Sequence, residues 1–191
     1  MINRREILRY LGYKGSEPTR DVLDLMESCI EEVLAVAEPK HVMRRFPVVL
    51  TDSTVTAGGL TFESESLARH LKGCWEVVFF AATLGAGVDR LLQKYLKLQV
   101  SKALIVQAVA ATAMEDYCNR CQQQLNEACA EEGLTVRNRF SPGYGDLKLE
   151  VQGEFLGLLQ AQKTVGIVLT EGNMMLPEKS VTAVMGLRPL Q

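Results

Sequence analysis

The stretch "CWEVVFFAAT", residues 74–83, is a nearly continuous run of apolar residues that favour extended backbone. A short run of this kind, followed by the turn-forming "LGAG", is typical of a strand that is buried on both faces. We therefore predict a buried strand at residues 74–83 and assign the remaining elements outward from it.

The residues before this strand predict helices and a hairpin. Residues 19–39, "TRDVLDLMESCIEEVLAVAEP", place apolar side chains at steps of three and four and predict an amphipathic helix that ends before Pro39. Residues 46–62, "FPVVLTDSTVTAGGLTF", predict two short strands separated by a turn at Gly58 and Gly59. A helix led by serine follows, "SESLARHLKG", and Gly73 closes it.

The residues after the strand predict two helices in succession. "LGAGVDRLLQKYL" is a turn that leads into a helix, and a long helix spans about Ser101 to Glu132, ended by Gly133. Its alanine-rich face should allow close packing. We place on this helix Leu104, Ala108, Ala111, Ala113, Met114 and Cys118.

The last third of the chain returns to strands. "LTVRNRF" (134–140) predicts a strand, "LEVQGEFLGLLQ" (149–160) a short amphipathic helix, and residues 164–187 two strands joined around "LPEK". Helices and hairpins alternate irregularly, so the expected class is α+β, with a largely antiparallel, twisted sheet and packed helices. We expect one domain over residues 1–191, with an N-terminal helical segment over about 1–40.

Composition limits the possible partners. The chain has 21 basic and 23 acidic residues and a net charge of -2, which gives no electrostatic reason to expect nucleic acid or an anionic membrane. Its start lacks the apolar run and cleavage site of a signal peptide, and no stretch approaches the roughly 18 apolar residues needed to span a bilayer. We expect a cytoplasmic protein with a small-molecule or protein partner.

Five scattered cysteines suit a reducing compartment better than a disulfide framework. Cys118 and Cys121 form a C-x-x-C inside the long helix, but His41 and His70 are far away in sequence. We therefore expect buried helix thiols here, and neither a zinc nor a redox site. The "LGAG" turn could offer backbone N–H groups to an anion, yet it lacks a dinucleotide or phosphate-loop fingerprint, so we expect a structural turn.

The segment "RNRFSPGYGDLKLEV", residues 137–151, sets an arginine beside a glycine-rich turn. Gly143 leaves the backbone accessible to a ligand, and Pro142 stiffens the turn before it. Arg139 presents a planar fork of donors suited to a carboxylate or phosphate, and Tyr144 adds a flat face with a polar tip. This set suits a zwitterionic or nucleoside-like ligand, although an exposed arginine next to an ordinary turn would give the same pattern.

Two motifs occur in order in the last third of the chain, the R-x-x-x-G-Y of "RFSPGY" and, after it, "LTEGNMMLPEKSV". Together they resemble a known family, the activation domain of cobalamin-dependent methionine synthase in its freestanding form. The upstream "SLARHLKGCWEVVFFAATLGAGVDRLLQKY" is also similar to freestanding members. The resemblance covers about residues 61–187, within an activation-domain-like, S-adenosylmethionine-binding region that we expect over about 41–191.

The resemblance implies a repair function. The family binds S-adenosylmethionine so that oxidised cobalamin can be reduced and remethylated, and the cobalamin would here be carried by a partner protein. Residues implied to bind S-adenosylmethionine are Arg139, Ser141, Gly143 and Tyr144 of the motif, Glu115 of the preceding helix, and Met185 of the last strand. The implied partners are a corrinoid-binding methionine synthase or methyltransferase subunit and a flavodoxin-like reductant.

Two departures from the family pattern bear on this reading. The C-P-x-H segment that lies near the corrinoid in the fused enzyme is missing from "GYGDLKLEV", and Met185 and Gly186 stand where the fused domain has aromatic residues. Adenine packing would then depend on a thioether. A module that docks on a corrinoid protein without using S-adenosylmethionine therefore remains an alternative. An unrelated methyltransferase is another, although the chain lacks the usual glycine-rich fingerprint near its start.

Overall fold

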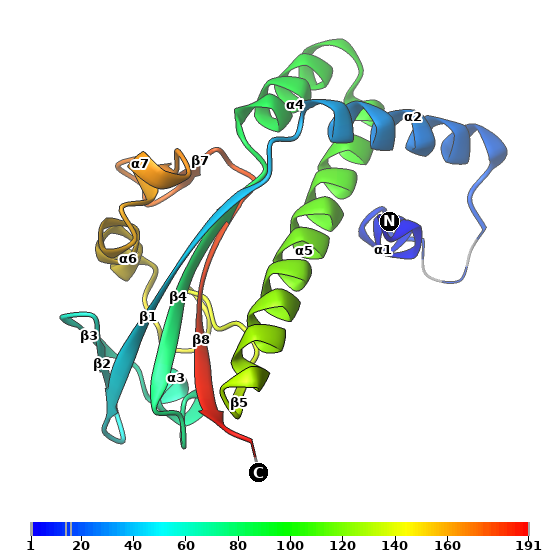
Figure 1. Cartoon of the computed structure of the whole chain (residues 1–191). Helices are drawn as coiled ribbons and strands as arrows, with labels where there is room; N and C mark the ends of the chain where they lie inside the picture. Colours follow the sequence, from blue (N-terminus) through cyan, green and yellow to red (C-terminus); the bar gives the residue numbers. More distant parts are fainter. Residues whose placement is uncertain (1, 14, 16, 191) are drawn as a thin grey trace.

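Strand β4 (Glu76–Thr83) lies inside a six-stranded sheet, between β1 (Lys40–Leu50) and β8 (Ser180–Pro189), as the computed structural model of the chain shows (Figure 1). The structure describes residues 2–13, 15 and 17–190. Phe79 and Phe80 of β4 point to opposite faces, and both are at most 1% exposed. The predicted strand with two buried faces is confirmed, and burial of each phenyl ring stabilises the fold by about 1.5–3 kcal/mol.

The sheet has the strand order β3-β2-β1-β4-β8-β5. The other strands are β2 (Thr54–Ala57), β3 (Leu60–Glu63) and β5 (Leu134–Val136), and each pairing in the sheet is antiparallel. The predicted α+β class with an antiparallel sheet is therefore confirmed. Gly58 and Gly59 form the predicted turn between β2 and β3, where both have positive φ angles of 61° and 82°. β1 begins earlier than predicted, at Lys40, because it pairs with the full length of β4.

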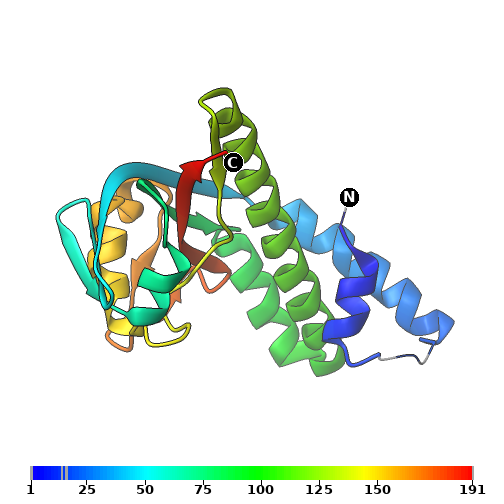
Figure 2. The same cartoon turned by 90° about the horizontal axis from the view of Figure 1, so that it is seen from below.

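One face of the sheet is covered by α5 (Val100–Glu131), the long helix that the sequence predicted. Helices α4 (Ala86–Leu98), α2 (Arg20–Val36) and α1 (Arg4–Tyr10) pack beyond and beside α5 (Figures 1 and 2). Their apolar side chains share one buried cluster with alternate residues of β4 and β8. Leu104 was placed on the packed face of α5, but 62% of its surface is exposed, because its neighbours Ala103 and Ile105 occupy the buried positions.

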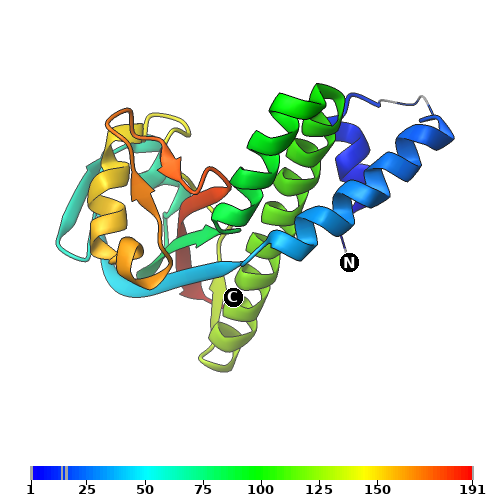
Figure 3. The same ribbon diagram turned by 90° about the horizontal axis from the view of Figure 1, so that it is seen from above.

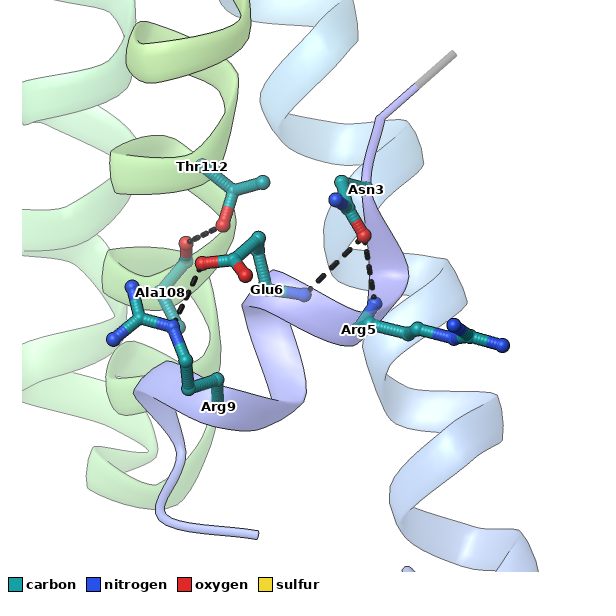
Figure 4. A network of polar contacts seen from close by, with 6 residues as sticks. All are labelled: Asn3, Arg5, Glu6, Arg9, Ala108 and Thr112. Atoms are coloured by element: carbon teal, nitrogen blue, oxygen red, sulfur yellow. Dashed lines mark hydrogen bonds and ion pairs between the residues drawn. The ribbon is translucent and has the colours of Figure 1, made fainter. Parts of the chain in front are cut away.

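The N-terminal helix α1 is fixed by a cap and by contact with α5. The side chain of Asn3 accepts hydrogen bonds from the backbone N–H groups of Arg5 and Glu6 (Figure 4). A cap of this kind contributes about 1 kcal/mol to helix stability. Ile7 of α1 is fully buried in the same cluster as the core residues of α5, so this segment is part of the core on that face.

The opposite face of the sheet is covered by shorter helices (Figure 3). These are α3 (Glu65–His70), the 3-10 turn η1 (Leu149–Val151), α6 (Gln152–Leu158) and α7 (Ala161–Thr164). They form a second buried cluster with the other alternate residues of β4. The predicted serine-led helix is confirmed, since Ser64 caps α3 by accepting from Leu67 N–H at 3.0 Å.

The C-terminal strands differ from the prediction. We expected two strands joined around "LPEK", but β6 (Val168–Leu169) and β7 (Met175–Leu176) pair with each other as a separate hairpin. The "LPEK" segment instead connects that hairpin to β8, which joins the main sheet. The turn at Glu171 to Asn173 separates two strands that are too short to show a periodic pattern. Among the described residues, no helix combines the length and the apolar character that crossing a bilayer requires.

Candidate functional site

Arg139 follows the edge strand β5 and points at α5. Its Nη1 donates to Gln122 Oε1 at 2.9 Å, and its Nη2 donates to Asn119 Oδ1 at 2.9 Å. The same Nη2 forms an ion pair with Glu115 Oε1 at 2.5 Å. The three acceptors are spaced by four and three residues, so they lie on one face of α5. Only 15% of the arginine side chain is exposed, and the guanidinium therefore holds the edge segment against the helix.

A polar depression surrounds this contact. Its volume is about 740 Å³, and it lies between α5, the segment after β5 and the start of β8. Four of the predicted site residues line it, namely Glu115, Arg139, Ser141 and Tyr144. The other lining residues are Asn119, Gln122, Gln123, Asn126, Thr135, Val136, Asn138 and Val181.

The lining chemistry suits a polar, zwitterionic ligand. One guanidinium and one carboxylate stand beside several side-chain amides, which can both donate and accept. The Tyr144 ring is 62% exposed and offers an aromatic face at the rim. Arg139 and Glu115 bear the two charges that an amino-acid end group would need, a cation for its carboxylate and an anion for its ammonium.

The glycine-rich loop has a rigid conformation of its own. Gly143 has a φ angle of +91°, which favours glycine, and its N–H donates to Leu147 O at 2.8 Å. The N–H of Tyr144 donates to Ser141 O at 3.1 Å. These two donors, which the sequence suggested as ligand contacts, are therefore used inside the loop. Gly145 is required for packing, since an added Cβ would lie 2.7 Å from Ser66 Oγ.

Asp146 anchors the loop to α3. Its carboxylate accepts from Ser64 Oγ at 2.5 Å, from Glu65 N–H at 2.8 Å and from Ser66 N–H at 3.1 Å. The hydrogen bond from Ser64, followed by those from the backbone, lowers the pKa of Asp146 to about 2. In Figure 2 the segment after β5 runs from the end of α5 past α3 toward α6. The loop that presents Tyr144 is thus fixed at both ends.

Met185 and Gly143 lie differently from the other site residues. Met185 is fully buried in the cluster between β8 and α5 and is not among the residues that line the depression. Its position follows from the alternation of β8, which turns it inward beside Ala183 and Leu187. Gly143 lies in the exposed turn but outside the lining.

The sequence did not single out Asn119, Gln122 or Asp146. The 115, 119, 122 spacing is visible in the sequence, but a polar stripe on a helix usually faces solvent. Asp146 lies close to the motif in sequence, but the residues that donate hydrogen bonds to it are 80 to 82 positions earlier in the chain. Only the tertiary structure shows which polar residues meet Arg139 and which hold the loop.

The C-x-x-C pair lies in the interior. Cys118 and Cys121 are 0% and 3% exposed, and burial raises the pKa of the Cys118 thiol to about 12. His41 is distant in sequence but lies beside them in the fold, with Nδ1 3.5 Å from Cys121 Sγ and 2.8 Å from Tyr117 Oη. In the part of the chain that the structure describes, no group of three or more His, Cys, Asp or Glu side chains could hold a metal ion.

The "LGAG" turn is a packing element. Gly85 has a φ angle of +81°, and its N–H donates to Thr83 Oγ1 at 3.0 Å. A Cβ at Gly87 would lie 2.2 Å from the backbone oxygen of Val36, at the end of α2. These glycines therefore let α4 begin in close contact with α2, which agrees with the structural interpretation of this motif.

The fold and the depression define an α+β protein with an open, polar depression between an edge of the sheet and its long helix. Residues 69–190 match the family described as vitamin B12 dependent methionine synthase, activation domain, and the chain belongs to this family. The match includes Glu115, Arg139 and the whole glycine-rich loop.

A solved structure supports the fold assignment. It is described as the crystal structure of the MetH reactivation domain bound to AdoHcy, and it superposes on this chain with a TM-score of 0.73 at 16% sequence identity. The likeness covers 98% of this chain and 74% of that chain. At this identity the comparison shows the fold alone. No curated protein matches the chain.

Proposed function

We propose that this protein binds S-adenosylmethionine in the polar depression and supports reductive remethylation of a cobalamin cofactor. The cobalamin would be carried in trans by a methionine synthase or a related corrinoid protein. The observation that carries the proposal is the Arg139 fork, held beside Glu115 and the Tyr144 loop inside a region that matches the activation-domain family. The AdoHcy named for the structurally similar domain supports the same class of ligand.

In the proposed complex Arg139 pairs with the ligand carboxylate. Glu115 already occupies part of the fork, so the ligand must displace it. The Glu115 side chain is 57% exposed and sits on a helix surface, where it can rotate away at small cost. Once displaced, its carboxylate is placed to accept from the ligand ammonium. One ion pair is thereby exchanged for two, which favours a zwitterion over a simple anion.

The remainder of the ligand would lie against Tyr144 and the amides of α5. The exposed Tyr144 ring suits the adenine or the sulfonium, because an aromatic face attracts a cation and stacks on a base. Ser141 adds a hydroxyl beside this ring. We do not include Met185, since it is fully buried in the core.

The chemistry at cobalt belongs to the corrinoid, which supplies the metal that accepts the methyl group. This chain would hold the methyl donor. We propose that the isolated protein does not retain cobalamin and instead associates with the corrinoid-carrying protein. A flavodoxin-like protein would supply the electron. Cobalamin that co-purifies in stoichiometric amount with the isolated chain would contradict this part of the proposal.

The decisive experiment is a double-mutant cycle. The wild type and Arg139→Ala are titrated calorimetrically with S-adenosylmethionine and with its decarboxylated analogue. A charge-assisted hydrogen bond contributes about 1.5–3 kcal/mol, so Arg139→Ala should cost roughly 10- to 100-fold in affinity for the first ligand and little for the second. Arg139→Lys should restore only part of the loss, since it keeps the charge without the fork. A coupling near zero would overturn the assignment.

The alternative function is a docking module that does not use S-adenosylmethionine. The missing C-P-x-H segment is the observation that favours it. A remethylation assay with the corrinoid protein separates the two functions. If the chain binds the corrinoid protein, binds no S-adenosylmethionine, and leaves the rate of remethylation unchanged, the docking function is correct.

A further inference from the structure

A second depression lies at the same edge of the sheet. It has a volume of about 410 Å³ and is formed by β5, the end of β8 and the end of α3. Its lining residues are His70, Thr135, Val136, Arg137, Asn138 and Arg188. This lining contains two arginines and no carboxylate, in contrast to the first depression, where Glu115 balances Arg139.

The two arginines are brought together by strand pairing. Arg188 of β8 stands opposite Thr135 of β5, and the N–H of Arg137 donates to Gly186 O at 2.8 Å. Alternation along both strands therefore places the Arg137 and Arg188 side chains on the face that carries α3. The Arg137 Nη2 donates to Lys72 O at the end of α3 at 3.2 Å. Arg139, only two residues further on, points instead to α5.

The buried thiol of Cys74 also indicates that Arg137 and Arg188 lie close together. Burial raises the pKa of Cys74, and the positive charges of Arg137 and Arg188 both oppose that rise. Both guanidinium groups therefore lie near one sulfur atom. Cys74 itself is only 6% exposed.

Both guanidinium groups have unused donors. The Nε atoms of Arg137 and Arg188 are buried, and neither has a hydrogen-bond partner among the described residues. Within the same part of the chain, neither arginine takes part in an ion pair. Both side chains are half-buried, and a buried donor without a partner is costly, so a bound oxyanion that accepts from the two Nε–H groups would remove much of that cost. Two adjacent cations without a carboxylate favour an anion that carries two charges.

Other side-chain donors complete the lining. His70 Nε2 lies 2.8 Å from Asn138 O, and since a carbonyl can only accept, this ring nitrogen carries the hydrogen. The Thr135 hydroxyl and the Asn138 amide can each donate to an oxygen of a bound ligand.

We propose that Arg137 and Arg188 form a binding site for the phosphate group of a small phosphate ester. A guanidinium fork matches the geometry of phosphate oxygens, and the dianion balances the two arginine charges. The site uses other arginines than the Arg139 fork, although the two depressions share Thr135, Val136 and Asn138, and it does not depend on the proposed function. Together with the proposed Arg139 site, it would give this sheet edge two anion sites whose arginines point to opposite faces.

The test measures binding of inorganic phosphate and of phenyl phosphate by equilibrium dialysis at low chloride concentration. The variants are Arg137→Gln and Arg188→Gln, with Arg69→Gln as the control, because Arg69 is exposed on α3, outside the lining, and loses the same charge. Each of the first two should weaken phosphate binding by at least ~10-fold, and the control by less than about twofold. Arg188→Gln keeps the test valid if loss of the Arg137 contact to Lys72 O impairs folding.

Three outcomes would overturn the proposal. The first is the absence of saturable phosphate binding to the folded wild type. The second is an equal loss in all three variants, which would mean that general positive potential, and not a built site, attracts the anion. The third is a site that takes acetate as tightly as phosphate, or that binds a glutamate-rich peptide far more tightly than either, which would make it a carboxylate or protein-docking site. Calorimetric titration with S-adenosylmethionine should be unchanged in Arg188→Gln.

Discussion

Glu115 and Arg139 form an ion pair in which the two partners differ sharply in exposure. Their Nη2–Oε1 distance is 2.5 Å, the carboxylate side chain is 57% exposed, and the guanidinium side chain is 15% exposed. The arginine is fixed by two further acceptors on α5, whereas the glutamate side chain makes no other hydrogen bond or ion pair among the described residues. Arg139 is therefore the fixed partner, and Glu115 is the partner that can move when a ligand binds.

Glu115→Gln should reduce discrimination between zwitterionic and anionic ligands. In the wild type the glutamate attracts the ligand ammonium and competes with a ligand that has only a carboxylate. We expect the ratio of affinities for S-adenosylmethionine and for its deaminated analogue to fall by about tenfold in the variant, as loss of one charge-assisted contact implies. Calorimetry with both ligands measures the ratio. Gln123→Ala, which also lines the depression, is the control and should leave the ratio unchanged.

Arg139→Ala should destabilise the fold as well as weaken binding. The side chain is mostly buried and joins the segment after β5 to α5 through three acceptors. Because those acceptors can regain water on the helix surface, we expect a modest loss of about 1–2 kcal/mol in the free energy of unfolding. Urea denaturation measures it. Arg90→Ala, on an exposed position of α4, should change stability by less than about 0.5 kcal/mol, and an equal loss there would contradict the expectation.

Asp146 should contribute stability in a defined pH range. Its pKa is lowered to about 2 in the folded protein, chiefly by the hydrogen bond from Ser64, against an ordinary value of 3.8. A depressed carboxyl pKa stabilises the folded state above the unfolded pKa, and this stabilisation is lost as pH falls from about 4 toward about 2. Asp146→Asn should therefore lower the melting temperature at pH 7. The difference in melting temperature between the variant and the wild type should become smaller below about pH 4. Asp52→Asn, an exposed acidic position, is the control.

Gly87→Ala should be strongly destabilising, while Gly157→Ala should not. A Cβ at position 87 would lie 2.2 Å from Val36 O, so α2 and α4 would have to separate, at a cost of about 1–3 kcal/mol or more. At position 157, in α6, no atom lies within 4 Å of the added Cβ, and alanine is favoured in helices by up to about 1 kcal/mol. Thermal unfolding of both variants gives the comparison. Equal melting temperatures would show that the "LGAG" turn does not need its small residue.

The five thiols should react slowly in the native protein. All five are buried, and burial raises the pKa of Cys29 to about 11 and that of Cys118 to about 12, so few thiolates are present at pH 8. A disulfide reagent should label the native chain slowly and all five sites rapidly in denaturant. A Cys118→Ala and Cys121→Ala double variant should retain activity in remethylation. Loss of activity in a folded double variant, or stoichiometric zinc in the wild type, would contradict this.

The sequence alone determined the elements that are long or strongly patterned. The apolar run at 74–83 and the 32-residue helix α5 have patterns long enough to predict a strand and a helix. Gly58 and Gly59 predict a turn, because glycine readily adopts the positive φ angles found there. The motif around Arg139 also suggested the kind of ligand that we propose, because a guanidinium fork beside a glycine-rich turn has specific donor geometry. These features depend on residues that are adjacent in the chain or spaced along one helix.

Only the tertiary structure decided which distant residues meet. It placed Glu115, Asn119 and Gln122 against Arg139, joined Asp146 to α3, and set Arg137 beside Arg188 through strand pairing. It also turned Met185 into the core and Leu104 out to solvent, although both are apolar and lie in regular elements. The reason is physical: a local pattern fixes the repeat of side chains along an element, whereas the packing of one element on another decides which face is buried and which charges become neighbours.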